Sequence, residues 1–247
     1  MHKPGRNEVC ACGSGHKYKR CCMGREASRA AFAADVDRRA LPVLSELAGF
    51  AERNAGAALD AIARRYFPYW TAPLDDRQAT RALDFLMFDM RLEGIGGRAI
   101  DEFIIERGDG AAAEERAMLT AWSQALRALY VVESWSGGFV TCIDALDDEP
   151  RRIEVLPLRG DGPLAKGRPI ALRPMECAGG FFCIGSPLEF GEQNADDVIA
   201  EVKRRHFDYV RNRRIAGVAD YLRFEPTALD EVAARGRKRS VIVIPGA

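Results

Sequence analysis

Four cysteines within thirteen residues constrain the fold of this chain more than any other feature. They follow the pattern C-x-C, an eight-residue loop and an adjacent pair, and are Cys10, Cys12, Cys21 and Cys22. Two close thiol pairs separated by a reversing loop can surround one ion, and four thiolates suit tetrahedral zinc. Gly13 and Gly15 follow the first pair, where a sharp turn needs backbone freedom. The spacing therefore predicts a tetrathiolate zinc site, although such a site also accepts iron.

The alternatives at this cluster are free thiols, disulfides or an imidazole ligand. His16 lies in the loop and is a possible replacement for one cysteine. The chain begins without the apolar run of a secretory signal, so we expect a cytoplasmic protein with reduced thiols. No stretch is long and apolar enough to span a membrane.

The first segment, residues 1–24, has almost no aliphatic side chains and cannot form a core of its own. Structural zinc contributes on the order of 10–16 kcal/mol of apparent binding free energy in short peptides. A bound metal would therefore hold together a segment that hydrophobic burial cannot.

This segment resembles a known family. The run RNEVCACGSGHKYKRCC, over residues 6–22, is similar to the SEC-C motif, the zinc module at the tail of the bacterial preprotein translocase motor SecA. Two positions depart from it: Cys22 stands where many members have histidine, and His16 where lysine is common. The rest of the chain resembles other SEC-C proteins only in having a helical block followed by short strands.

The resemblance implies a contact surface, since the module of the translocase docks an export chaperone and is linked to ribosome association. The matching surface in this sequence is formed by Lys17, Tyr18, Lys19 and Arg20. Residues 1–29 hold seven basic and two acidic side chains, a net charge of +5, which a zinc tetrathiolate reduces to about +3. Because the whole chain has no net charge, a local basic module of this kind must carry any contact with RNA phosphates or an acidic protein face.

Residues 25–129 have the pattern of a helical domain. Apolar side chains recur at helical spacing, and Pro42, Pro68, Pro73 and a glycine cluster at 94–97 mark expected boundaries. The three clearest stripes are Leu41, Leu44, Ala48 and Ala51; Leu83, Leu86, Met87 and Met90; and Met118, Trp122, Ala125 and Leu129.

Residues 130–247 change to short β-type runs followed by a helix and a basic tail. Each run is bounded by Gly, Pro or Asp turn signals. The runs are 130–132, 139–143, 153–156, 169–172 and 181–184. We therefore expect an α+β fold: an N-terminal zinc knuckle, a multi-helix domain, then a small antiparallel sheet or partly closed barrel with a C-terminal helix. The tail has a basic run at 235–239 and an apolar run at 241–244.

Few residues offer catalytic chemistry. The remaining cysteines, Cys142, Cys177 and Cys183, are expected to be buried thiols, with a second metal site as the alternative. His206 is expected to be packed on a helix. A weaker candidate polar site is formed by Asp84, Asp89, Glu93, Asp101 and Glu102. Four aromatic side chains, Trp135, Phe139, Phe181 and Phe182, fit either the core or a base-stacking face.

The sequence favours an accessory protein whose zinc module docks a macromolecular partner, either a ribosome or its RNA or an export chaperone. An enzyme with a site between the helical and β segments, or a nucleic-acid-binding regulator, is the alternative. The first two readings differ in whether a pocket holds convergent side chains such as Asp89, Arg91 or Glu102.

Overall fold

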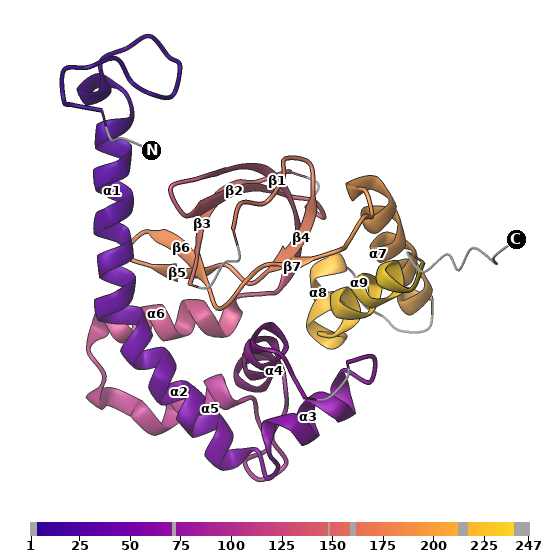
Figure 1. The fold of residues 1–247 in the computed structure, drawn as a ribbon. Helices are drawn as coiled ribbons and strands as arrows, with labels where there is room; N and C mark the ends of the chain where they lie inside the picture. Colours follow the sequence, from indigo (N-terminus) through magenta and orange to yellow (C-terminus); the bar gives the residue numbers. More distant parts are fainter. Residues whose placement is uncertain (1–3, 71–72, 148, 159–161, 212–216, 240–247) are drawn as a thin grey trace, which may run out of the picture.

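The computed structural model describes residues 4–70, 73–147, 149–158, 162–211 and 217–239. A curled sheet lies at the centre, with one group of helices below it and a second group beside it (Figure 1). The helices are α1 (Cys22–Asp35), α2 (Leu41–Asn54), α3 (Leu59–Tyr66), α4 (Asp76–Phe88), α5 (Ala99–Arg107), α6 (Ala113–Gln124), α7 (Ala195–Val210), α8 (Val218–Phe224) and α9 (Ala228–Arg239), with short helical turns η1 (Tyr18–Arg20), η2 (Val36–Ala40) and η3 (Gly108–Gly110). None of the described helices is long and apolar enough to cross a membrane.

Seven strands form one mixed sheet in the order β5-β6-β3-β2-β1-β4-β7. Their bounds are β1 (Ala128–Ser136), β2 (Phe139–Asp144), β3 (Arg152–Pro157), β4 (Pro169–Leu172), β5 (Met175–Cys177), β6 (Gly180–Cys183) and β7 (Leu188–Glu189). The expected α+β fold with a small sheet after the helices is confirmed. Two details of the sheet differ from the expectation. The short strands β5 and β7 were not expected, and β3 and β6 pair in parallel, because the chain returns through β4 and β5 before β6.

Helices α1 and α2 form one continuous rod, whereas Pro42 was expected to end a helix. Proline lacks the amide that would bond to the carbonyl four residues earlier, at Arg38, and its ring crowds that turn. The π-helical turn η2 lies at this place and widens the helix. The rod therefore continues through Pro42, and residues 22–54 are helical without interruption.

The turn signals act largely as expected. Gly137 and Gly138 have positive φ and close the β1–β2 hairpin. Asp75 caps α4 and forms a capping box with Gln78. The third apolar stripe was too long, since α6 ends at Gln124 and Leu129 belongs to β1. The apolar run at 241–244 lies outside the described residues.

The largest core joins the helices to one edge of the sheet. Met175, Cys177 and Phe182 of β5 and β6 are buried against α2, α4, α5 and α6. The indole of Trp122 donates a hydrogen bond of 2.8 Å to the Glu176 carbonyl on β5. The C-terminal helices pack on the other side of the sheet, in a cluster that includes Leu129 and Phe190.

Candidate metal centre

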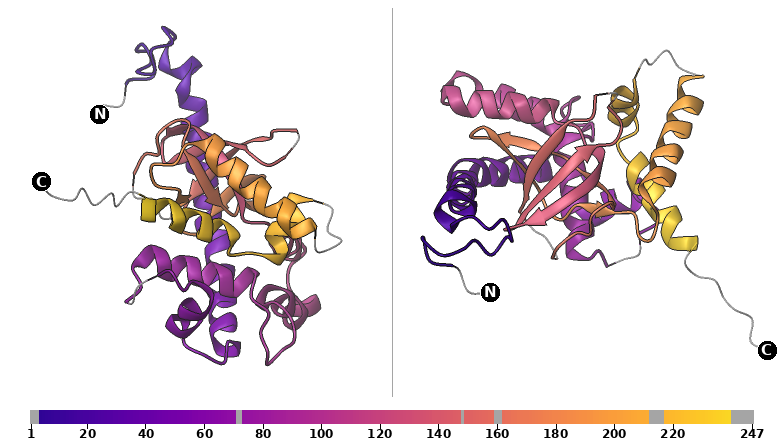
Figure 2. Two further views of the ribbon diagram at one scale, coloured as in Figure 1. Left: turned by 90° about the vertical axis from the view of Figure 1, so that its right-hand side faces the viewer. Right: turned by 90° about the horizontal axis from the view of Figure 1, so that it is seen from above.

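The cysteine-rich segment lies at the free end of α1, projecting beyond the sheet (Figures 1 and 2). A backbone bridge between Val9 and Lys17 closes its loop. The Cys10 amide donates to the His16 carbonyl at 2.8 Å. Gly13 and Gly15 adopt φ of 79° and 71°, so the expected positive-φ turn is present. The short turn η1 then leads directly into α1, whose first residue is Cys22.

The four thiols converge on one point. The Sγ atoms of Cys10, Cys12, Cys21 and Cys22 all lie within 4.8 Å of one another. The Cys12 and Cys21 sulfurs are 3.3 Å apart, and those of Cys21 and Cys22 are 3.8 Å apart. A tetrahedral ion with metal–sulfur bonds of 2.3 Å requires sulfurs about 3.8 Å apart. The donor set and its spacing therefore fit a metal ion.

The protonation of these thiols shows what a metal would change. Hydrogen bonds from the side chain and backbone of Ser14 lower the pKa of Cys12 to about 6. Cys22 behaves in the opposite way, because its hydrogen bonds to Cys10 and Cys12 raise its pKa to about 12. Four thiolates this close repel one another, and a divalent cation removes that repulsion.

Two residues near the sulfurs were not singled out from the sequence. The Ser14 hydroxyl lies 3.1 Å from the Cys21 sulfur. Arg25, one turn along α1, donates to the Cys22 sulfur at 3.5 Å. Such contacts orient metal ligands and offset their charge. The position of Ser14 between two turn glycines was the one sequence signal that could have placed its hydroxyl near the sulfurs.

Tyr18 has a different place from the one expected. Its side chain is 4% exposed and packs with Cys10 and Cys22, so it is not part of an open contact surface. Its hydroxyl donates to Glu26 on α1. Tyr18 therefore connects the cysteine loop to the helix.

The neighbouring basic residues are open to solvent. Lys17, Lys19 and Arg20 are all exposed. Within the described part of the chain, no ion pair involves any of the three. Arg6 and Arg25 are also exposed, so the module presents five cations on a tip away from the body.

The other candidates are structural. The described residues contain one group of His, Cys, Asp or Glu side chains placed to share an ion, and it includes neither His16 nor a second cysteine set. Burial raises the pKa of Cys142 to about 12 and also raises that of Cys183, as expected for buried thiols. Phe139 and Phe182 are buried, so the four aromatics do not form an open stacking face.

Asp84 and Asp89 are held in a buried cluster of ion pairs rather than an open polar site. Arg173 contacts Asp84 at 3.0 Å and Asp89 at 2.6 Å. Burial alone would raise the pKa of Asp84, but Arg173 and Arg81 outweigh it and lower the pKa. These carboxylates join α4 and the residue that follows it to Arg173, directly after β4, and are already neutralised.

The chain is thus an α+β protein with a four-cysteine cluster that can hold a metal ion. Residues 6–24 match the SEC-C motif, which confirms the resemblance seen in the sequence. Searches of curated proteins and of solved structures found no match to the chain.

Proposed function

We propose that Cys10, Cys12, Cys21 and Cys22 hold one zinc ion. All-sulfur donors favour zinc or iron over hard cations such as magnesium, and the tight sulfur spacing favours a closed structural site. The bound ion would supply stability rather than reactivity. The segment has only a small apolar cluster of its own, in which Tyr18 packs with Cys10 and Cys22 and Met23 is partly buried.

We further propose that this module docks a macromolecular partner through Lys17, Lys19 and Arg20, with Tyr18 supporting the surface from behind. The observation that carries this proposal is the position of the module at the tip of α1. A structural staple needs no such projection, whereas a docking surface benefits from reaching past the sheet (Figure 2).

The excess positive charge favours an anionic partner. Exposed lysine and arginine side chains bind RNA phosphates and acidic protein surfaces, with strong dependence on salt. We propose ribosomal RNA or the acidic face of an export chaperone as the partner, in the cytoplasm, where the thiols stay reduced.

We also propose that residues 1–24 form a unit separate from the body. The helical segment 25–129 and the β segment 130–247 share one core through Met175 and Phe182, which supports treating them as one packed body.

Affinity purification of the intact chain tests the docking proposal. The charge reversals Lys17→Glu, Lys19→Glu and Arg20→Glu should abolish a salt-sensitive partner that the wild type captures. The Cys10→Ser/Cys12→Ser variant should lose the same partner. A matched control reverses three exposed cations elsewhere, Arg53→Glu, Arg64→Glu and Lys203→Glu, and should retain it. Equal capture by all variants would remove the proposal.

A further inference from the structure

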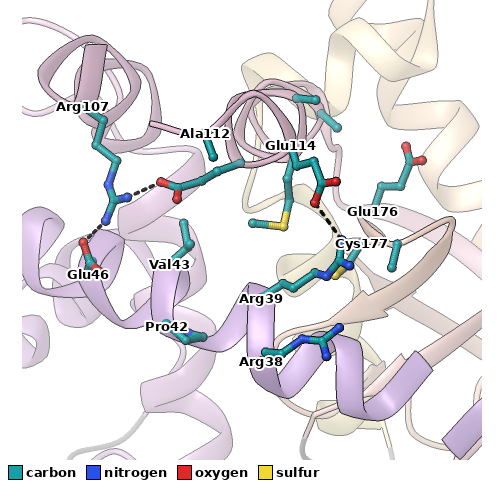
Figure 3. Close-up of a pocket in the computed structure, with 15 residues that line it drawn as sticks. Arg38, Arg39, Pro42, Val43, Glu46, Arg107, Ala112, Glu114, Glu176 and Cys177 are labelled. Atoms are coloured by element: carbon teal, nitrogen blue, oxygen red, sulfur yellow. Dashed lines mark hydrogen bonds and ion pairs between the residues drawn. The ribbon is translucent and has the colours of Figure 1, made fainter. Parts of the chain in front are cut away.

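A cavity of about 750 Å³ lies between the η2–α2 rod, α6 and the β5–β6 hairpin (Figure 3). This volume is within the range of about 300–1,000 Å³ that small-molecule sites occupy. The cavity is far along the rod from the cysteine cluster and shares no residue with it. Nothing in the proposed function of the metal module uses it.

The middle of the cavity is apolar. Pro42 and Val43 of α2, Met118 of α6 and Cys177 of β5 contribute to its lining. In Figure 3, Val43 lies between the side chains of Arg107 and Arg39, which mark the two polar ends of the cavity. Met118 is only partly buried, and a methionine side chain adapts readily to the shape of a ligand. The middle therefore suits an apolar body.

The first polar end is centred on Arg107. Its guanidinium is shared between Glu46 on α2 and Glu115 on α6. Two carboxylates on one guanidinium leave this end with one negative charge in excess.

The second polar end lies beside the π-helical turn. Arg39 pairs with Glu114 at 2.9 Å, and Arg38 pairs with Asp35 just outside the cavity. Glu176 of β5 also lines this end, and no ion pair involves it within the described part of the chain. This end therefore also carries one negative charge in excess, and its arginines are already matched by carboxylates.

Anionic ligands are disfavoured by this arrangement. An incoming carboxylate or phosphate would have to displace Glu114 from Arg39, or one of the two glutamates from Arg107. A cation can approach Glu176 or the shared pair of glutamates without breaking any contact. Charge complementarity thus selects the sign of the ligand.

We propose that this cavity binds an elongated organic cation, with an apolar body over Val43 and Met118 and an ammonium group at one or both ends. The π-helical turn is part of the site, because it places Arg38 and Arg39 together on the cavity wall. Such turns are frequent at functional sites.

Three probes of equal chain length separate the contributions of charge and shape. We would titrate the full chain with diaminooctane, octanediol and octanedioate by calorimetry or ligand-observed NMR. Diaminooctane should bind, octanediol should bind more weakly, and octanedioate should not bind. Added salt should lower the affinity of the chain for diaminooctane. Equal or tighter binding of octanedioate, or no binding of diaminooctane at millimolar concentration, would overturn the proposal.

Two variants locate the binding. Ala117→Trp adds bulk at an exposed position that lines the cavity and should abolish diamine binding, whereas Ala30→Trp on α1 should not. Glu176→Gln should lower the affinity for diaminooctane about two- to fivefold, as expected for the loss of a partly exposed ion pair. Glu52→Gln, an exposed carboxylate outside the cavity, should not. Binding that survives Ala117→Trp in a folded chain, or that ignores Glu176→Gln, would contradict the assignment. If Ala117→Trp fails to fold, the order of the three probes and Glu176→Gln still decide it.

Discussion

Arg29 of α1 and Glu154 of β3 form a two-pronged ion pair across the gap between the rod and the sheet. The Nη2–Oε1 distance is 2.6 Å and the Nε–Oε2 distance is 3.1 Å. Arg29 also donates to the Ser136 carbonyl at 2.9 Å and lies 5.0 Å from the centre of the Phe139 ring. This contact fixes the direction in which α1 carries the cysteine module.

Removing this side chain should loosen the rod. Arg29→Ala leaves Glu154 without its ion-pair partner and the Ser136 carbonyl without its hydrogen bond from Arg29, so we expect the free energy of unfolding to fall by about 1–3 kcal/mol. Chemical denaturation measures this change. Arg64→Ala, at an exposed position on α3, should stay within about 0.5 kcal/mol of wild type. An equal effect of the two would contradict the anchoring role.

The same pair predicts a dependence on pH. The hydrogen bonds from Arg29 hold the pKa of Glu154 below its ordinary value of 4.5. A lowered folded-state pKa stabilises the protein above the unfolded pKa, and the gain disappears as the pH falls through the folded value. The stability difference between wild type and Glu154→Gln should therefore be constant near neutral pH and shrink below about pH 4.5. A difference that grows in acid would contradict the pairing.

A second contact between α1 and the sheet depends on a missing side chain. A Cβ atom at Gly180 would lie 2.6 Å from the Phe32 ring. We expect Gly180→Ala to destabilise the chain by about 1–3 kcal/mol, because the ring must move. Gly24 is on α1, like Phe32, and a Cβ atom there would meet open space. Gly24→Ala should therefore stabilise the chain by up to about 1 kcal/mol. Thermal unfolding of both variants measures the contrast, and two changes of the same sign would refute it.

The buried ion-pair cluster attaches α9 to the body. Arg81 contacts Asp230 at 2.9 Å and Asp84 at 2.8 Å. Asp230→Asn removes one charge and leaves buried arginines in excess, which should cost about 3–5 kcal/mol. Asp220→Asn, exposed on α8, is the matched control and should have little effect. A small change at Asp230 in denaturant unfolding would show that the cluster is not needed for stability.

The sequence predicted the local features of the fold well. Gly13, Gly15 and the paired cysteines specify their own loop, and the Asp75 cap and Gly137-Gly138 turn act within a few residues. Such features depend on nearby atoms only. The convergence of the four cysteines could therefore be predicted almost entirely from their spacing.

Features that depend on distant contacts were missed. The parallel pairing of β3 with β6, and the very short strands β5 and β7, have no local signal. The continuation of the helix through Pro42 depends on a widened turn. Tyr18 looks like a surface residue beside two lysines and an arginine, and only its packing against Cys10 and Cys22 shows otherwise.

Metal removal should act locally. Since residues 4–21 have few apolar contacts besides Tyr18, chelation should expose their amides to rapid hydrogen exchange while α2 and the sheet keep their protection. Exchange measured by mass spectrometry before and after chelation tests this. Uniform loss of protection, or none in this segment, would contradict a metal-held module.

The metal content of the purified chain tests the central claim most directly. Elemental analysis of wild-type protein should give one zinc or iron ion per chain, and Cys10→Ser/Cys12→Ser should give close to none. A thiol titration on the same samples should find the four module cysteines protected in the wild type. Wild-type protein that is free of metal with all four thiols reactive, or metal content unchanged by the double substitution, would contradict the account.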